Sequence, residues 1–168
     1  MSERVDLVDG DGVTRLKNVE RELAENHPEL HMQIVIVVIF NNKGEVLVHQ
    51  RSANKKVNPG DIDHVCGGVI AGETPEQAAI RETREEAGVE LRDLTRVLCS
   101  VNKYDRYRWL FAARSDDSPV LSEPDDIQWV AYKPVAELAA KRETGDFTFV
   151  DDFFEETILA QKALGVPA

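Results

Sequence analysis

Three glutamates near the middle of the chain have the spacing of a metal-binding carboxylate group. Glu82, Glu85 and Glu86 stand at positions i, i+3 and i+4, so in a helix their side chains fall on one stripe. Like charges at this spacing repel one another and cost an isolated helix roughly a few tenths of a kcal/mol per pair. A hard divalent cation such as Mg²⁺ or Mn²⁺, which takes oxygen ligands and keeps waters that substrate phosphates displace, would offset that cost. The alternative is an acidic helix face that is only solvated.

The residues around the glutamates predict the helix that carries them. Thr74 suits the N-cap, Pro75 suits the first helical position, and Gln77 completes a capping box three residues after the cap. Gly88 supplies the stop. A second face of this helix is predicted to pack on the core, and it consists of Ala79, Ile80, Thr83 and Ala87. We expect the acidic stripe to be presented away from that core.

The stretch from Gly67 to Val89, GGVIAGETPEQAAIRETREEAGV, resembles the Nudix box of the Nudix hydrolase family. Thr83 stands where the family usually has an aliphatic residue, and a β-branched side chain suits that buried position. The positions that carry the resemblance are Gly67, Glu73, Arg81, Glu82, Glu85, Glu86 and Gly88.

This resemblance implies a metal-dependent hydrolysis. The expected reaction is attack of water on a phosphorus of a diphosphate linkage, in a nucleoside diphosphate or one of its derivatives, with Mg²⁺ or Mn²⁺ as cofactor. Glu82, Glu85 and Glu86 would hold the metal, and Glu82 is the first choice for general base. Arg81 would orient these carboxylates together with Glu73.

Residues outside the box extend the predicted site. In hydrolases of the family, a backbone carbonyl at the position of Cys66 binds a metal. A later loop often adds a carboxylate, for which Glu123, Asp125 and Asp126 are the candidates here and Glu123 is the choice. Arg51 and Lys55 lie in the most basic short segment of the chain and are predicted to bind the substrate's phosphates. The alternative for this pair is a solvated cationic surface.

Wider similarity, over roughly Val5 to Leu138, is to the branch of the superfamily that includes isopentenyl-diphosphate isomerase and its hydrolase relatives. The segments HQRSANKK, NPGDIDHVCGG and FAARSDD carry it. The first alternative function is therefore an isomerase that uses Cys66, which stands at the position of that enzyme's catalytic cysteine.

Three departures favour the hydrolase. Gly68 replaces an expected metal-binding histidine, while Tyr104 and Arg106 occupy the positions of two further acidic residues of the isomerase. A second alternative is a non-catalytic nucleotide sensor, which would be expected to have lost carboxylates of the box. Tyr104, together with Tyr107 and Trp109, is interpreted as core, with stacking on a base as the alternative.

Composition sets the class of protein. The 168 residues suit a single domain over 1–168, and the net charge of −11 argues against nucleic acid or an anionic membrane as partner. A small phosphorylated substrate is compatible with this charge, because a bound metal and a few local cations can reverse the sign of the site. The resemblance implies that this partner is a small diphosphate molecule. Two cysteines without disulfide or metal spacing suggest a reducing compartment. With no signal peptide and no run of about 18 apolar residues, the chain is predicted to be soluble and cytoplasmic. The sequence leaves open whether it forms a homodimer.

The order of elements predicts an α/β fold. A hairpin is expected over 3–20, a β-branched central strand over 33–40, and a second strand over 45–51 that pairs antiparallel with it. Three more strands are expected after Gly88, followed by a short helix over 134–141 and a C-terminal helix over 149–164. Helices should cover both faces of a mixed sheet. The resemblance implies the same arrangement, an α/β/α sandwich.

Overall fold

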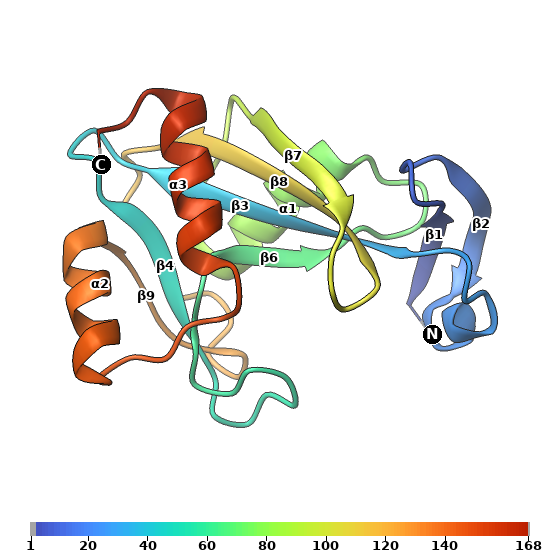
Figure 1. Cartoon of the computed structure of the whole chain (residues 1–168), viewed down its shortest axis with the longest axis horizontal. Helices are drawn as coiled ribbons and strands as arrows, with labels where there is room; N and C mark the ends of the chain where they lie inside the picture. The colour runs from blue at the N-terminus through green and yellow to red at the C-terminus, as the bar shows by residue number, and fades with distance from the viewer. Residues whose placement is uncertain (1–2, 168) are drawn as a thin grey trace.

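A seven-stranded mixed sheet forms the centre of the computed structural model, which describes residues 3–167 (Figure 1). The five strands of its main path lie in the order β5-β4-β3-β8-β7, while β6 pairs with β3 and β9 pairs with β4. In chain order the strands are β3 (Met32–Phe40), β4 (Val46–Arg51), β5 (Ile62–Asp63), β6 (Val65–Gly68), β7 (Thr95–Val101), β8 (Arg106–Arg114) and β9 (Ile127–Lys133).

The β-branched run predicted as the central strand is β3. It pairs in parallel with β8 along its whole length, from Met32 opposite Arg106 to Phe40 opposite Arg114. On its other edge two strands share it. Its first half pairs antiparallel with β6, whereas β4 pairs with it only at Phe40 and Val46 before diverging toward β9. The predicted antiparallel pairing of β3 with β4 is confirmed. Because β4 diverges from β3 after Val46, the edge of β3 is free to pair with β6.

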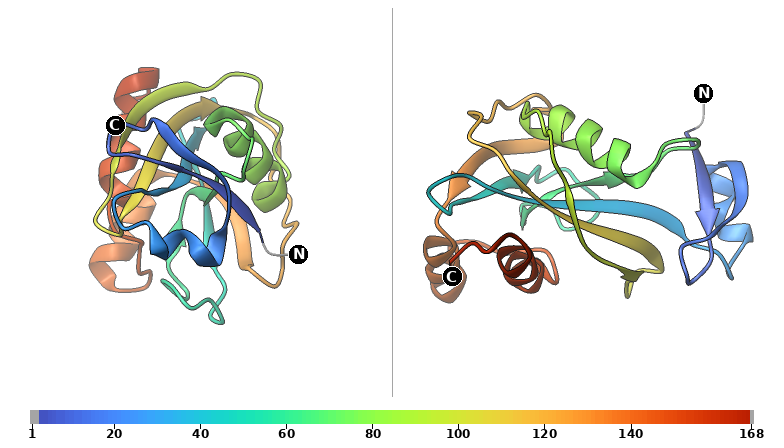
Figure 2. Two further views of the ribbon diagram at one scale, coloured as in Figure 1. Left: turned by 90° about the vertical axis from the view of Figure 1, so that its right-hand side faces the viewer. Right: turned by 90° about the horizontal axis from the view of Figure 1, so that it is seen from above.

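Helices cover the two faces of the sheet. Figure 2 (right) shows α1 (Pro75–Ala87) on one side and α2 (Val135–Thr144) with α3 (Phe153–Leu164) on the other. Alternate residues of β3 supply the two cores, because neighbouring side chains of a strand point to opposite faces. Val35 and Val37 pack with α1, whereas Val38 and Phe40 pack with the helices opposite. The predicted sandwich around a mixed sheet is confirmed.

The C-terminal helix starts later than the sequence predicts. The expected range was 149–164, but α3 begins at Phe153. Phe149 instead forms a bridge with Ile62, and the Val150 amide donates to the Ile62 carbonyl at 3.1 Å. Asp152 then takes a left-handed conformation with φ of 68° and serves as the N-cap. The preceding segment is thus held by the edge of the sheet.

The predicted N-terminal hairpin is present as β1 (Arg4–Val8) and β2 (Thr14–Glu20), followed by a 3₁₀ turn over Arg21–Asn26. It also fixes the loop that leads into α1. The Arg4 carbonyl accepts from the Ala71 amide at 2.8 Å, and the Asp6 carboxylate accepts from the Gly72 amide at 3.1 Å. Among the described residues, no helix has the length and apolar character needed to cross a membrane.

Candidate active site

The ends of α1 form as the sequence predicts. The Thr74 hydroxyl accepts from the Gln77 amide at 3.2 Å, and the Gln77 side chain accepts from the Thr74 amide at 2.8 Å. Gly88 closes the helix in a left-handed conformation with φ of 64°. On the buried face, the Thr83 hydroxyl donates to the Ala79 carbonyl at 2.7 Å, which satisfies the one polar group that this position introduces. The helix that carries the acidic stripe is therefore fixed at both ends.

The acidic stripe is not simply presented to solvent. The Glu85 side chain is 44% exposed, but those of Glu82 and Glu86 are only 14% and 13% exposed because they lie against β6. Gly67 makes this approach feasible: a Cβ at that position would lie 2.0 Å from the Cδ of Glu82. The expectation of an outward stripe is thus wrong for two of its three members. The motif has a glycine at position 67 because any side chain there would collide with the Glu82 carboxylate.

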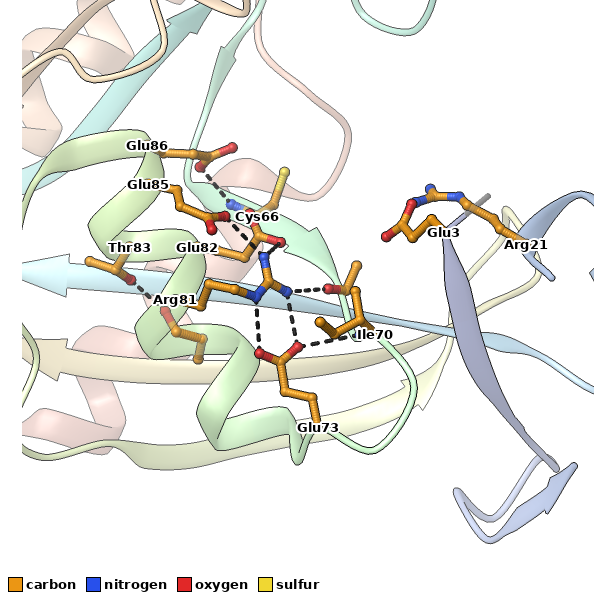
Figure 3. A network of polar contacts seen from close by, with 12 residues as sticks. Glu3, Arg21, Cys66, Ile70, Glu73, Arg81, Glu82, Thr83, Glu85 and Glu86 are labelled. Carbon is orange, nitrogen blue, oxygen red and sulfur yellow. Dashed lines mark hydrogen bonds and ion pairs between the residues drawn. The ribbon is translucent and has the colours of Figure 1, made fainter. Parts of the chain in front are cut away.

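Arg81 binds the carboxylates of the box together (Figure 3). Its guanidinium grips Glu73 with two hydrogen bonds of 2.9 and 3.0 Å, and it donates to Glu82 at 2.6 Å and to Glu85 at 3.0 Å. The fifth donor reaches the Gly68 carbonyl of β6 at 2.8 Å. All five N–H groups of the side chain are used, so the predicted contacts of Arg81 with Glu73 and Glu85 are present.

Glu86 is the most deeply placed carboxylate of the stripe. Its Oε2 accepts from the Cys66 amide at 3.1 Å, and the Nδ1 of His49 lies 3.7 Å away. Burial raises the pKa of Glu86 well above its ordinary value, and the nearby carboxylates of Asp63 and Glu82 raise it further. Burial also lowers the pKa of His49 to about 3, so this imidazole is neutral and adds no positive charge. Glu86 therefore has no cationic partner among these neighbours.

Glu82 is poised between its two protonation states near neutral pH. Burial raises its pKa to about 7, against the opposing effect of Arg81. The Glu123 carboxylate lies close enough to raise the pKa values of both Glu82 and Glu86 by charge repulsion. The structure thus brings Glu123, predicted from a distant loop, to the same side as the acidic stripe.

The donor set fits a hard divalent cation in its chemistry. Glu82, Glu86 and Glu123 offer only carboxylate oxygens, and their mutual repulsion is the deficit that a cation would relieve. Over residues 3–167, however, no group of three or more His, Cys, Asp or Glu side chains is already arranged to hold a metal ion. Arg81 accounts for this, because it draws Glu82 and Glu85 to itself while Glu86 faces the Cys66 amide.

The predicted phosphate-binding residues are engaged within the protein. Arg51 donates to the Asp63 carboxylate at 3.0 Å and to the carbonyls of Val57 and Asn58 at 3.1 Å each. Lys55 forms an ion pair of 2.6 Å with Asp126. Arg51 thus holds the loop that follows β4.

The Cys66 side chain points to the face opposite the acidic stripe. Its thiol donates to the Asp63 carboxylate at 3.4 Å, and burial raises the pKa of the thiol well above its usual range. Asp63 itself is buried, and burial raises its pKa against the effect of Arg51. No site role is predicted from the sequence for Asp63 or His49. The available signal was that both fall within the segments HQRSANKK and NPGDIDHVCGG, and that each follows an apolar residue within its strand.

Comparison with known proteins gives consistent results. The NUDIX domain family matches residues 30–153. An uncharacterized Nudix hydrolase of Listeria innocua is 31% identical over 136 residues, which cover 76% of this chain and 79% of that protein. An isopentenyl-diphosphate Delta-isomerase of Salmonella heidelberg is 50% identical over 113 residues, which cover 58% of this chain and 60% of that protein. A crystal structure of a Deinococcus radiodurans protein superposes with a TM-score of 0.70 at 24% identity and covers 99% of this chain and 100% of its own.

Proposed function

The chain belongs to the Nudix hydrolase family, and we propose that it hydrolyses a diphosphate linkage in a nucleoside diphosphate or one of its derivatives by attack of water on phosphorus. The observation that carries this proposal is the buried pair of Glu82 and Glu86. Both have raised pKa values, and Arg81 holds Glu82 at a fixed place beside β6. Buried like charges of this kind are costly to a fold and are typical of functional sites.

Mg²⁺, or Mn²⁺ in its place, would be held by the carboxylates of Glu82, Glu85 and Glu86. Glu123 and the Cys66 carbonyl would be further oxygen ligands. When bound, the ion would supply the positive charge that neutralises the diphosphate oxygens. Glu82 is proposed to take the proton of the attacking water, because Arg81 fixes its carboxylate beside the other acidic side chains of the site.

The other residues position Glu82 for this step. Arg81 and Glu73 keep its carboxylate in place during the reaction, because their mutual contact is bidentate and leaves the arginine little freedom. Water oxygen bonds to phosphorus, the bridging P–O bond breaks, and two phosphorylated or phosphate products leave.

The phosphates of the substrate are proposed to bind to Lys55 and, to a lesser extent, to Arg51, whose guanidinium is already engaged within the protein. Lys55 is partly exposed, and within the described part of the chain its ammonium group pairs with the half-exposed Asp126 alone. Surface ion pairs of this type are weak, so an incoming phosphate can replace Asp126 as the partner of Lys55. We also propose a cytoplasmic location, in keeping with the free thiols of Cys66 and Cys99.

Isomerisation of isopentenyl diphosphate is the second candidate. The observation that favours it is the position of the Cys66 thiol in a cavity, beside the carboxylate of Asp63. Against it stand Tyr104 and Arg106, which line the same cavity where the isomerase has two acidic residues. A sensor without activity is the third candidate, and the complete set of carboxylates in the box disfavours it.

A single screen separates these candidates. The protein is incubated with Mg²⁺ and with nucleoside diphosphates, nucleotide sugars, dinucleotides and isopentenyl diphosphate, and both phosphate release and double-bond migration are followed. The hydrolase proposal expects Mg²⁺-dependent release of phosphate or of a nucleotide from at least one nucleoside-containing compound. Double-bond migration without hydrolysis of any compound would instead establish the isomerase.

A further inference from the structure

The N-terminal hairpin of β1 and β2 forms a separate unit at one end of the molecule (Figure 1). It has a small core of its own, in which Val5, Leu7 and Ala24 are buried, apart from the two cores of the central sheet. The hairpin also lies before residue 30, where the match to the NUDIX domain family begins. That match therefore assigns the hairpin no role.

The hairpin holds the box loop, residues 69–73, which runs from the end of β6 to the N-cap of α1. Figure 2 (right) shows this loop reaching across to β1. The Ala71 amide donates to the Arg4 carbonyl at 2.8 Å, and the Gly72 amide donates to the Asp6 carboxylate at 3.1 Å. The other three amides of the loop donate to β3 or to acceptors within the loop itself. The hairpin thus fixes two of five consecutive amides of the box loop.

Asp6 uses both of its carboxylate oxygens for this attachment. Its Oδ2 accepts from the Gly72 amide, and its Oδ1 accepts from the Asn18 amide of β2 at 2.7 Å. Both donors belong to residues in the left-handed region, with φ of 81° for Gly72 and 59° for Asn18. The Asp6 carbonyl in turn accepts from the Gln33 side chain of β3 at 3.1 Å. Asp6 therefore joins the hairpin, the central strand and the box loop.

The box loop delivers Glu73 to Arg81. Gly72 directly precedes Glu73, whose side chain is 12% exposed and accepts two hydrogen bonds from Arg81, at 2.9 and 3.0 Å. The same guanidinium donates to Glu82 at 2.6 Å, as Figure 3 shows. A continuous series of contacts therefore runs through Asp6, Gly72, Glu73, Arg81 and Glu82.

We propose that Asp6 is a positioning residue of the active site, which fixes the box loop so that Glu73 holds Arg81 in the orientation that Glu82 needs. The inference rests on the proposed hydrolase function. A glycine with a positive φ leaves the backbone many alternatives, and the carboxylate of Asp6 removes them at Gly72. Displacement of a reacting group by about 1 Å costs up to about 100-fold in rate, so a small movement of this loop is enough to slow the reaction.

The first test is Asp6→Ala, which takes the acceptor from both amides. With Mg²⁺ and one diphosphate substrate, kcat should fall about tenfold, on the scale of residues that orient metal ligands without binding the metal. KM should change by less than about twofold, because Asp6 acts on turnover and not on uniform binding of the substrate. Unchanged kcat, or a loss that appears in KM alone, overturns the inference. Asp6→Asn keeps one acceptor, should show a smaller loss of the same kind, and replaces the alanine variant throughout if melting curves show that the latter is unfolded.

Asp9 offers a matched control in the same hairpin. Its Oδ1 also accepts from two backbone amides, those of Asp11 and Val13, at 3.0 Å each, but both belong to the hairpin turn. Asp9→Ala thus weakens the hairpin without releasing the box loop, and kcat should stay within about twofold of wild type. Equal losses in Asp6→Ala and Asp9→Ala would show that the hairpin matters only as a folded unit, which contradicts a specific role of Asp6.

A double-mutant cycle tests the route of the effect. If Asp6 acts through Glu73, Asp6→Ala should cost less than about twofold in kcat when Glu73→Ala is already present, because changes along one series of contacts are not additive. A merely structural contribution of Asp6 would give the same tenfold loss in both backgrounds, and that result would overturn the inference.

A second measurement is independent of catalysis. Exchange of the Arg81 Nε–H with water is followed by NMR in the metal-free protein, since this hydrogen is held by Glu73. The exchange should be at least about tenfold faster in Asp6→Ala and unchanged in Asp9→Ala. If wild type hydrolyses no diphosphate but this difference is seen, the proposed function fails while the positioning of Arg81 by Asp6 stands. If exchange is the same in Asp6→Ala as in wild type, the inference is wrong whatever the activity.

Discussion

Two arginines gather carboxylates on opposite faces of the same sheet, and they differ in how completely they are satisfied. Arg81 uses all five of its N–H groups on the residues of the box and on β6. Arg108 binds Glu156 but leaves its buried Nε without a partner among the described residues. The first network uses every donor of its arginine, whereas the second leaves one buried donor without a partner within residues 3–167, which costs stability.

This difference separates a fully satisfied network from one that carries an internal cost. A complete network holds Glu82 and Glu85 at fixed positions, which is what a general base and metal ligands need. A buried donor without a partner is costly to the folded state. The predictions below disturb these two networks and the contacts of Arg51, one at a time.

Among the changes that keep all the carboxylates of the stripe, the largest effect is expected where a single methyl group disturbs the support of Glu82. Gly67→Ala places a Cβ 2.0 Å from the Cδ of Glu82, so the carboxylate must move, and a shift of this kind costs about 100-fold in kcat/KM. Gly68→Ala is the matched control, since its Cβ would be 3.6 Å from the nearest atom, on the Arg21 side chain. Steady-state kinetics of both variants on one diphosphate should show the loss in the first alone; equal activities would mean that Glu82 needs no fixed position.

A smaller loss is expected from Arg81→Lys. The charge remains, but an ammonium group cannot make a bidentate contact with Glu73 while also holding Glu82 and Glu85. Partners that orient metal ligands typically contribute about 10–100-fold in activity or metal affinity. We expect kcat to fall by this factor, and calorimetric titration with Mg²⁺ reports the affinity. Arg84→Lys, which alters an exposed pair with Glu90 on the same helix, should match wild type in both measurements.

Arg51→Ala should affect stability more than substrate binding. The guanidinium holds the carbonyls of Val57 and Asn58 and is the cationic partner of the buried Asp63. Its loss leaves a buried acceptor unsatisfied, at a cost of about 2 kcal/mol in the free energy of unfolding, which urea denaturation measures. A variant as stable as wild type but with a raised KM would instead identify Arg51 as a phosphate ligand first and a structural residue second.

The last of these predictions concerns the pH dependence of stability and leaves activity aside. Glu156 has a folded pKa raised from 4.5 to about 8, so between these values the folded state holds more protons than the unfolded state and stability falls as pH rises. Glu156→Gln cannot titrate. In urea denaturation of the metal-free protein, the stability of this variant relative to wild type should therefore increase from about pH 5 to about pH 8. Glu76→Gln should show no such trend above pH 5, because the pKa of Glu76 is lowered. If the difference in stability between Glu156→Gln and wild type did not change with pH, the raised pKa would be contradicted and the Glu156 carboxylate would be charged in the wall of the cavity that Cys66 also lines.

Much of the fold and part of the site follow from local sequence. The capping box at Thr74 and the stop at Gly88 depend on neighbours within a few residues, and both are present as predicted. The spacing of Arg81 and Glu85 likewise fixes their contact on one helix. Such features need no knowledge of the rest of the chain.

Other features depend on contacts between distant segments. The burial of Glu82 follows from Gly67, on a different element, and the later start of α3 follows from the pairing of Phe149 with Ile62. Arg108 and Glu156 are 48 positions apart, on a strand and a helix that only the tertiary fold brings together. No local pattern marks either residue, which is why this ion pair is visible in the structure alone.

Replacement of Glu86 tests the central claim most directly. Glu86→Gln keeps the size of the side chain and removes the buried carboxylate whose raised pKa marks the site. Wild type and variant are compared for Mg²⁺-dependent hydrolysis of the same panel of diphosphates, with folding confirmed by melting curves. We predict a loss of about 10³-fold in kcat/KM for the variant, on the scale of a missing group that stabilises charge at the reacting phosphorus. Equal turnover by the two proteins would show that the carboxylates of the Nudix box do not perform the reaction.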